Sequence, residues 1–304
     1  MDPQLPSLPE TERLSASVVR ILGGNPGKFT LQGTNTYLVG RGPRRLLIDT
    51  GGGKPAWIQS LKTVLTSERA IVDSVILTHW HLDHVGGVND LLESLPGTSV
   101  YKSGADDNQL DIQDGQRFSV EGATLRALYS PGHTKDHVTL VFEEEDAMFT
   151  GDNVLGHGTA VFEDLASYLS SLEKMRHQFS GRAYPGHGQV IEDGAAKILE
   201  YIEHRAERES QVIQVLVSAR GSPDMVQSDG NGDSVGWTSM EIVKVIYKDV
   251  REDLHSAAER GVLQVLKKLQ EEDKTILDST SNRWRLGDRA FPVELKSTPV
   301  SGNT

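Results

Sequence analysis

Four potential metal ligands fall within six residues of the sequence, namely His79, His81, Asp83 and His84. Imidazole nitrogens and carboxylate oxygens are ligand types that zinc, manganese and iron accept. An apolar run over residues 72–78 comes directly before them and has the composition of a buried β-strand. Because a turn at a strand end can direct several side chains to one point, this pattern predicts a metal centre.

Three later segments repeat the arrangement of an apolar run, a glycine and a potential ligand. Residues 124–129 precede Pro-Gly-His133, residues 147–150 precede Gly-Asp152, and residues 182–184 precede Pro-Gly-His187. Each segment alone is compatible with an ordinary turn. As a set at successive strand ends, they predict the remaining ligands of the same centre.

The rest of the chain supplies the elements that must position these side chains. Strands are expected at residues 18–22, 36–39, 45–49 and 138–143, and helices at 57–65, 85–95, 165–179 and 195–218. Strands come first and then alternate with helices, which predicts sheets covered by helices.

Composition predicts the domain boundaries. The proline-rich segment 1–15 is expected to be a loose lead, and residues 16–220 to be the domain that carries the ligands. Residues 221–235 are rich in Gly, Ser and Asp and are typical of a linker or loop. In residues 236–296, helical patterns at 239–250 and 255–272 precede a hairpin pattern at 275–278 and 283–286, which predicts a winged-helix-like module; 297–304 is a polar tail.

Composition also excludes several kinds of chemistry and partner. The 304 residues contain no cysteine, which excludes a disulfide framework, a thiolate zinc site and a cysteine nucleophile. The net charge of −12 disfavours a surface that binds polyanions. The N-terminus has no secretory or transit pattern, and no apolar run approaches the roughly 20 residues that span a bilayer. We therefore expect a cytoplasmic protein without a membrane partner.

The motifs HWHLDH, PGHT, TGDN and YPGHG, in this order, resemble the metallo-β-lactamase superfamily over residues 17–205. This resemblance implies an α/β fold, an αββα metallo-β-lactamase sandwich, with two metal ions at one edge; zinc is expected, and manganese or iron is possible. It implies that Asp49, in LLIDTG, supports the histidine loop from behind the ligands. The implied ligands are His79, His81 and His133 for the first ion, Asp83, His84 and His187 for the second, and Asp152 as the bridge.

Other residues near these motifs are candidates for supporting roles. His137 follows the proposed ligand His133 and is expected behind the ligands or in the pocket. An ordinary structural role is the alternative for it and for each pocket candidate. The candidates for the substrate pocket are Asn35, Tyr37, Trp80, Asn153 and His157.

Residues 22–40, 42–51, 120–137 and 149–158 resemble two branches of this superfamily. One is the lactamase-β-like endoribonuclease branch, which also carries a winged-helix-like segment. The other comprises stand-alone, polyketide-synthase-associated thioesterases of the atrochrysone carboxyl ACP type, to which residues 153–158 and 162–165 are closer. This branch implies cleavage of an acyl thioester on the acyl carrier protein domain of a non-reducing polyketide synthase. Product would leave by hydrolysis or Claisen-type closure, with a bridging metal-bound hydroxide as nucleophile and Asp83 as proton donor or acceptor.

Two alternatives remain open at this point. An endoribonuclease could use the same dinuclear site on single-stranded RNA, and a scaffold protein could keep the metals without catalysis. Residues 237–289 contain ten Lys/Arg and ten Asp/Glu, so the winged-helix-like segment is neutral and the excess acid lies before it. A nucleic-acid groove is expected to show clustered Lys/Arg, so nucleic acid is an unlikely partner. All seven proposed ligands are present, which disfavours the scaffold.

Overall fold

The computed structural model of the protein describes residues 5–218 and 236–287. The expected linker at 221–235 and the expected tail at 297–304 lie outside the described residues. The chain divides into two compact units, Met1–Ile202 and Glu203–Thr304. The division falls inside helix α5 (Gly194–Ser218). Each unit is described separately.

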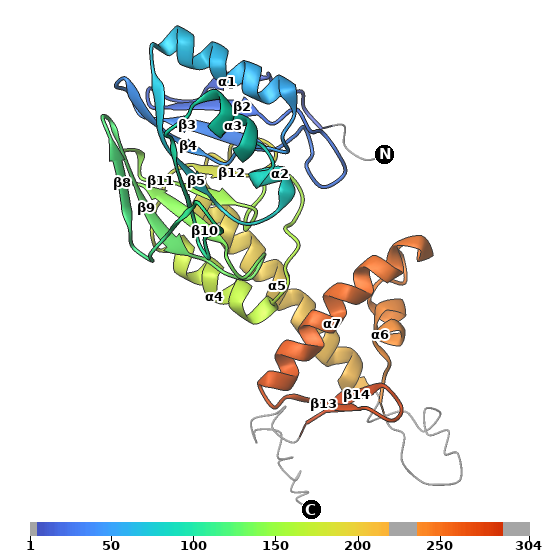
Figure 1. Ribbon diagram of the computed structural model, residues 1–304. Coiled ribbons are helices and arrows are strands. Elements are labelled where there is room, and N and C mark those ends of the chain that lie inside the picture. Colours follow the sequence, from blue (N-terminus) through green and yellow to red (C-terminus); the bar gives the residue numbers. More distant parts are fainter. Residues whose placement is uncertain (1–4, 219–235, 288–304) are drawn as a thin grey trace, which may run out of the picture. The chain divides into compact units, whose positions relative to one another are not determined.

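Two β-sheets form the centre of the first unit (Figure 1). The first sheet has seven strands that follow the order of the chain; β1 to β4 are antiparallel, and β4 to β7 are parallel. These strands are β1 (Thr11–Arg13), β2 (Val18–Leu22), β3 (Asn35–Val39), β4 (Arg44–Ile48), β5 (Ile71–Leu77), β6 (Ser99–Lys102) and β7 (Leu110–Asp111).

The second sheet has five strands in the order β12-β11-β10-β9-β8. Its strands are β8 (Arg117–Val120), β9 (Ala123–Tyr129), β10 (Val138–Phe142), β11 (Ala147–Gly151) and β12 (Ala183–Pro185), and the one-turn helix η1 (Glu143–Glu145) joins β10 to β11. Strand β10 is antiparallel to both β9 and β11, and β12 is parallel to β11. Strands β9, β11 and β12 therefore run in one direction, and their C-terminal ends lie at the same edge.

Helices cover the outer faces of the two sheets, which confirms the predicted αββα sandwich. Helices α1 (Pro55–Glu68) and α3 (Val88–Ser94) cover the first sheet; α4 (Leu165–Arg176) and the start of α5 cover the second (Figure 1). Helix α1 starts with a proline in its first turn, a position that needs no backbone N–H. Its buried residues recur at helical spacing, so one face packs on the sheet.

The alternation of side chains along each strand divides the hydrophobic core into two layers. Tyr37 and Val39 of β3 point between the sheets, whereas Leu38 packs in the layer beneath α1. Strand β5 contributes Ile76 to the inner layer and Val75 to the outer one. A strand buried on both faces needs apolar residues at nearly every position, which explains the continuous apolar run before His79.

In its described residues, the second unit contains the C-terminal part of α5 and then two further helices followed by a hairpin, as predicted for a winged-helix module. Helix α6 (Ser239–Ile246) starts with a capping box formed by Thr238 and Glu241. The one-turn helix η3 (Glu252–Leu254) and helix α7 (His255–Glu271) follow, and β13 (Thr275–Asp278) pairs with β14 (Arg283–Leu286).

Two expectations differ from the structure. Thr11–Arg13, within the expected loose lead, form β1 and pair with β2 at the edge of the first sheet. The helix expected over residues 85–95 is divided into α2 (Leu82–Val85) and α3. The division lies at a Gly-Gly pair, and residue 87 must be glycine because a Cβ atom there would stand 2.2 Å from the carbonyl oxygen of Thr50.

In the two stretches that the structure describes, no helix combines the length and the apolar character that crossing a bilayer requires.

Candidate metal centre

The proposed ligands lie together at one edge of the sandwich because each follows the end of a strand. His79 and His81 come directly after β5, and α2 then carries Asp83 and His84. The other three come from the second sheet, where the C-terminal ends of β9, β11 and β12 share an edge. These three are His133, Asp152 and His187.

The seven side chains form two groups whose donor atoms lie within 4.8 Å of one another. In the first group, His81 Nδ1 is 3.0 Å from His79 Nε2 and 3.1 Å from His133 Nε2. The second group contains Asp83, His84 and His187, and the Nε2 atoms of its two histidines are 3.3 Å apart.

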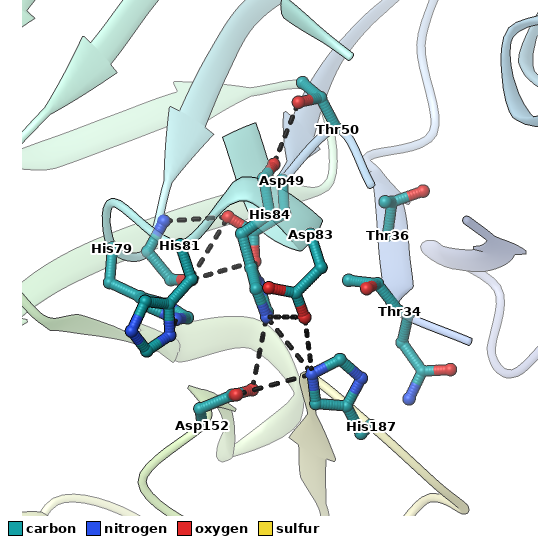
Figure 2. Close-up of polar contacts among 12 residues, drawn as sticks. Thr34, Thr36, Asp49, Thr50, His79, His81, Asp83, His84, Asp152 and His187 are labelled. Carbon is teal, nitrogen blue, oxygen red and sulfur yellow. Dashed lines mark hydrogen bonds and ion pairs between the residues drawn. The ribbon is translucent and has the colours of Figure 1, made fainter. Parts of the chain in front are cut away.

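Asp152 lies between the two groups (Figure 2). Its Oδ2 atom is 3.7 Å from His133 Nε2 in the first group and 3.3 Å from His187 Nε2 in the second. Its Oδ1 atom is 3.3 Å from His84 Nε2. One carboxylate therefore faces both groups, as a bridging ligand does.

Hydrogen bonds at the far side of two histidine rings direct the other ring nitrogen into the cluster. His84 Nδ1 donates a hydrogen bond to Asp49 Oδ2 at 2.7 Å, and His133 Nδ1 donates to the carbonyl oxygen of Val161 at 2.7 Å. In the neutral imidazole these bonds leave Nε2 as a bare lone pair directed into the cluster. Two lone pairs about 3 Å apart cannot hydrogen bond to each other, but a cation between them satisfies both.

The buried oxygen Oδ1 of Asp152 supports the same conclusion. Among the described residues, no donor reaches it with normal hydrogen-bond geometry. A buried carboxylate oxygen without a partner is unfavourable unless a cation completes its surroundings. The donor set therefore fits divalent metal ions.

Asp49 orients two of the histidines from behind the cluster (Figure 2). Besides His84, its carboxylate accepts hydrogen bonds from the backbone N–H of Thr78 at 2.8 Å and from the Thr78 hydroxyl at 2.9 Å. The Thr78 oxygen lies 3.0 Å from His79 Nδ1 and can accept a hydrogen bond from its N–H. One buried carboxylate thus sets the orientation of a ring in each group.

His137 and Gly186 position Asp152. The buried His137 accepts a hydrogen bond at Nε2 from the backbone N–H of Asp152, at 3.1 Å. Its Nδ1 atom lies 3.0 Å from the hydroxyl of Ser130. A Cβ atom at Gly186 would stand 2.3 Å from Asp152 Oδ1, so only glycine leaves room for this carboxylate.

The carboxylates give the cluster a field that favours cations. Burial disfavours a charge on His187, but Asp152 and Asp83 outweigh this and raise its pKa to about 9. Burial likewise disfavours the charged form of Asp152, but His187 and His84 hold its pKa well below the usual range. At His79, burial and the neighbouring His84 lower the pKa well below the usual value. The carboxylates are thus ionised, and a divalent cation would be stabilised here.

Three of the five pocket candidates are buried and hydrogen bond to the loops. Asn35 Nδ2 donates to the carbonyl oxygens of Pro185 and Gly188, both at 2.9 Å, and the Tyr37 hydroxyl donates to that of Pro185 at 2.7 Å. These bonds hold the loop that carries His187. Asn153 Nδ2 donates to the carbonyl oxygen of Ser130 at 2.8 Å. The other two candidates, Trp80 and His157, are exposed.

Three contributors were not anticipated from the sequence. Thr78 connects Asp49 to His79, and its position directly before the histidine motif was an available signal. Gly186 was visible as a motif residue, but its steric role was not. Val161 contributes only a backbone carbonyl, which has no signature in the sequence.

Comparisons with protein families match both units. Residues 29–107 and 97–187 match the model of the metallo-beta-lactamase superfamily. Residues 238–284 match the beta-lactamase associated winged helix domain.

Several fungal proteins are similar to this chain over most of its length. "Lactamase-like protein adaB" from Aspergillus niger is 46% identical over 285 residues, which cover 92% of this chain and 89% of that protein. "Lactamase-like protein nscB" from Arthroderma gypseum is 48% identical, and the matched region covers 88% of this chain and 86% of that protein. A protein of Aspergillus chevalieri named "Atrochrysone carboxyl ACP thioesterase" is 46% identical and covers 92% and 90%.

Solved structures show the same fold at low sequence identity. A beta-lactamase domain protein from Burkholderia ambifaria has a TM-score of 0.73 and 17% identity, with 92% of this chain and 95% of that chain covered. A metallo-beta-lactamase family protein from Thermus thermophilus has a TM-score of 0.66 and 20% identity, with 90% of this chain and 100% of that chain covered.

Proposed function

The chain belongs to the metallo-beta-lactamase superfamily, and on this premise we propose that it is a metal-dependent thioesterase. It would cleave the acyl thioester on an acyl carrier protein domain of a non-reducing polyketide synthase and release the polyketide product. The observation that carries the proposal is Asp152, whose carboxylate faces two adjacent groups of ligands. This arrangement suits two metal ions that share one reaction centre.

The ligand assignment is part of the proposal. His79, His81 and His133 would hold one ion, Asp83, His84 and His187 the other, and Asp152 both; zinc is the expected metal. When bound, two such ions supply a water-derived nucleophile at neutral pH and a Lewis acid for the thioester carbonyl. Asp49, Thr78 and His137 keep the ligands in position through the hydrogen bonds described above.

Asp83 is the residue best placed to move a proton. Its carboxylate is only partly buried, and Oδ2 lies 3.2 Å from His187 Nε2. Burial favours its neutral form, but His187 and His84 outweigh this and lower its pKa, so Asp83 is ionised and its carboxylate is free of a proton that would block acceptance of another. A thiol leaving group, with a pKa near 8.5, departs as thiolate and does not require a strong general acid.

The choice of a thioester over RNA is supported by similarity and by charge. One relative at 46% identity is named as an ACP thioesterase, and the others cited carry the general name lactamase-like protein. The chain as a whole carries a net charge of −12, with the excess acid before residue 237. Such a balance disfavours the tracking of a phosphate backbone.

The proposal is tested by assaying the metal-loaded full chain against an acyl thioester on a carrier protein and against single-stranded RNA. Metal analysis should find two ions per chain. We expect thioester turnover that Asp152→Ala and Asp83→Ala reduce by at least about 100-fold. Asp107→Ala, at an exposed aspartate outside the cluster, is the matched control and should retain full activity. Turnover of RNA without turnover of thioester would refute the proposal, and so would bound metals without turnover of either.

A further inference from the structure

Solvent reaches the metal cluster from one side. Five of its seven side chains are at most 8% exposed, whereas His81 and Asp83 are only partly buried. A substrate must therefore approach over His81 and Asp83. The residues beside these two determine what the entrance can bind.

Three large apolar residues next to residues of the cluster have exposed side chains. Trp80 and Leu82 flank His81 in the sequence and are 50% and 76% exposed. The Trp80 ring contacts the His81 ring at a centroid distance of 4.5 Å. Val161 is 65% exposed, and the hydrogen bond from His133 to its carbonyl oxygen fixes its backbone beside the first group. We call Trp80, Leu82 and Val161 the apolar rim.

Exposure alone does not distinguish these side chains. Trp57 and Trp284 are almost fully buried, but Phe29 is 73% exposed, so the rim is distinguished by its position next to residues of the cluster. A single exposed leucine is common and carries no information. Three large apolar side chains around one reaction centre indicate a binding surface.

We propose that the apolar rim is the acyl-binding subsite of the enzyme, and that it binds an apolar, planar group attached to the scissile carbonyl. This inference rests on the proposed thioesterase function. The position of the rim indicates which part of the substrate it binds. A group that covers Trp80 and Leu82 lies beside His81 and Asp83, the two partly exposed residues of the cluster. The substrate's own acyl group meets this condition. Trp80 offers a flat face for stacking, and no rim side chain offers a positive charge to a phosphate.

The test compares two thioesters of N-acetylcysteamine with the metal-loaded full chain. The acetyl and 1-naphthylacetyl thioesters have the same thiol and similar carbonyl groups, but only the second has a planar apolar extension. We expect Trp80→Ala to lower kcat/KM for the naphthylacetyl substrate roughly 2- to 10-fold, mainly through KM. The acetyl substrate and the metal content should be unchanged. Leu82→Ala should act in the same direction.

Ile71→Ala is the matched control, because Ile71 is an exposed apolar residue at the start of β5, away from the strand end that carries His79. It should leave both substrates unchanged. Equal loss on both substrates in Trp80→Ala, or no loss on either, would overturn the acyl subsite and leave the thioesterase proposal intact. Turnover of neither thioester by the metal-loaded wild type would instead refute the thioesterase proposal and the subsite with it. A change of oligomeric state in Trp80→Ala on size-exclusion chromatography would identify the rim as an interface between copies and also overturn the subsite.

Discussion

Replacement of Asp49 by asparagine should weaken one metal position and spare the other. Asp49 Oδ1 accepts from the backbone N–H of Thr78 at 2.8 Å, and Oδ2 accepts from His84 Nδ1 at 2.7 Å. The Thr78 hydroxyl lies within hydrogen-bond distance of both oxygens, 3.1 Å from Oδ1 and 2.9 Å from Oδ2. Asparagine retains the first oxygen and tolerates the left-handed backbone at this position, where φ is +59°. Its amide N–H would face the N–H of His84, so two donors would oppose each other.

The expected magnitude follows from the bond that is lost. To avoid the opposed donors, the His84 ring must carry its proton on Nε2, the atom that faces His187 and Asp152. A buried hydrogen bond to a charged group contributes about 1.5–3 kcal/mol. Loss of a partner behind a metal ligand lowers affinity about 10- to 100-fold, which corresponds to a similar energy. The group of Asp83, His84 and His187 should bind its metal ion more weakly by this amount. The group of His79 should change little, because Thr78 can still donate to the remaining oxygen of residue 49.

The assay is a zinc titration in competition with a chromophoric chelator, which resolves the two binding steps. Asp49→Asn should retain the first step and show the second weakened about 10- to 100-fold, with a parallel fall in kcat. Asp73→Asn is the matched control, because Asp73 lies on the neighbouring strand β5 and pairs with the exposed Arg44. Wild-type affinity at both steps, or equal weakening of both, would refute the reasoning about Asp49.

Three further outcomes are expected. Gly186→Ala should abolish binding of at least one zinc ion in metal analysis, because its Cβ atom would stand 2.3 Å from Asp152 Oδ1; two bound ions would contradict this. In chelator-treated protein, the pKa of His187 is raised to about 9 in the folded state, above its ordinary value of 6.5. Protonated His187 therefore stabilises the folded state fully below pH 6.5, and this stabilisation is lost as the pH rises through 9. Urea unfolding should therefore show a stability loss of up to roughly 3 kcal/mol between pH 6.5 and 9.5, which His187→Gln should abolish. In the winged-helix unit, burial favours the neutral form of Glu241, but the Thr238 backbone N–H and Arg283 outweigh this and lower its pKa. Ionised Glu241 therefore stabilises the folded state above pH 4.5, and this stabilisation is lost in acid. Glu241→Gln should reduce stability at pH 7 by about 1 kcal/mol and by less at pH 3; equal losses at both would contradict this.

The sequence alone determined the fold class and the types of ligand available. The fold could be predicted because the apolar runs, the glycines and the hairpin at 275–278 and 283–286 are local patterns, and the structure has strands at these residues. All seven side chains predicted as ligands are in the two groups that the structure brings together. Their positions at strand ends were sufficient for this, because strands that run in one direction end at one edge.

Only the tertiary structure decided which residues reach solvent and which hold the loops. Short strands such as β1 and β7 depend on pairing with a neighbouring strand, so their own residues do not specify them. Asn35 is buried where it binds carbonyl oxygens about 150 residues away, whereas half of the Trp80 surface stays exposed. Hydrogen bonds and burial of this kind depend on contacts between distant segments. A single sequence therefore names the chemical groups, but the fold determines which of them face the metals, the substrate or the core.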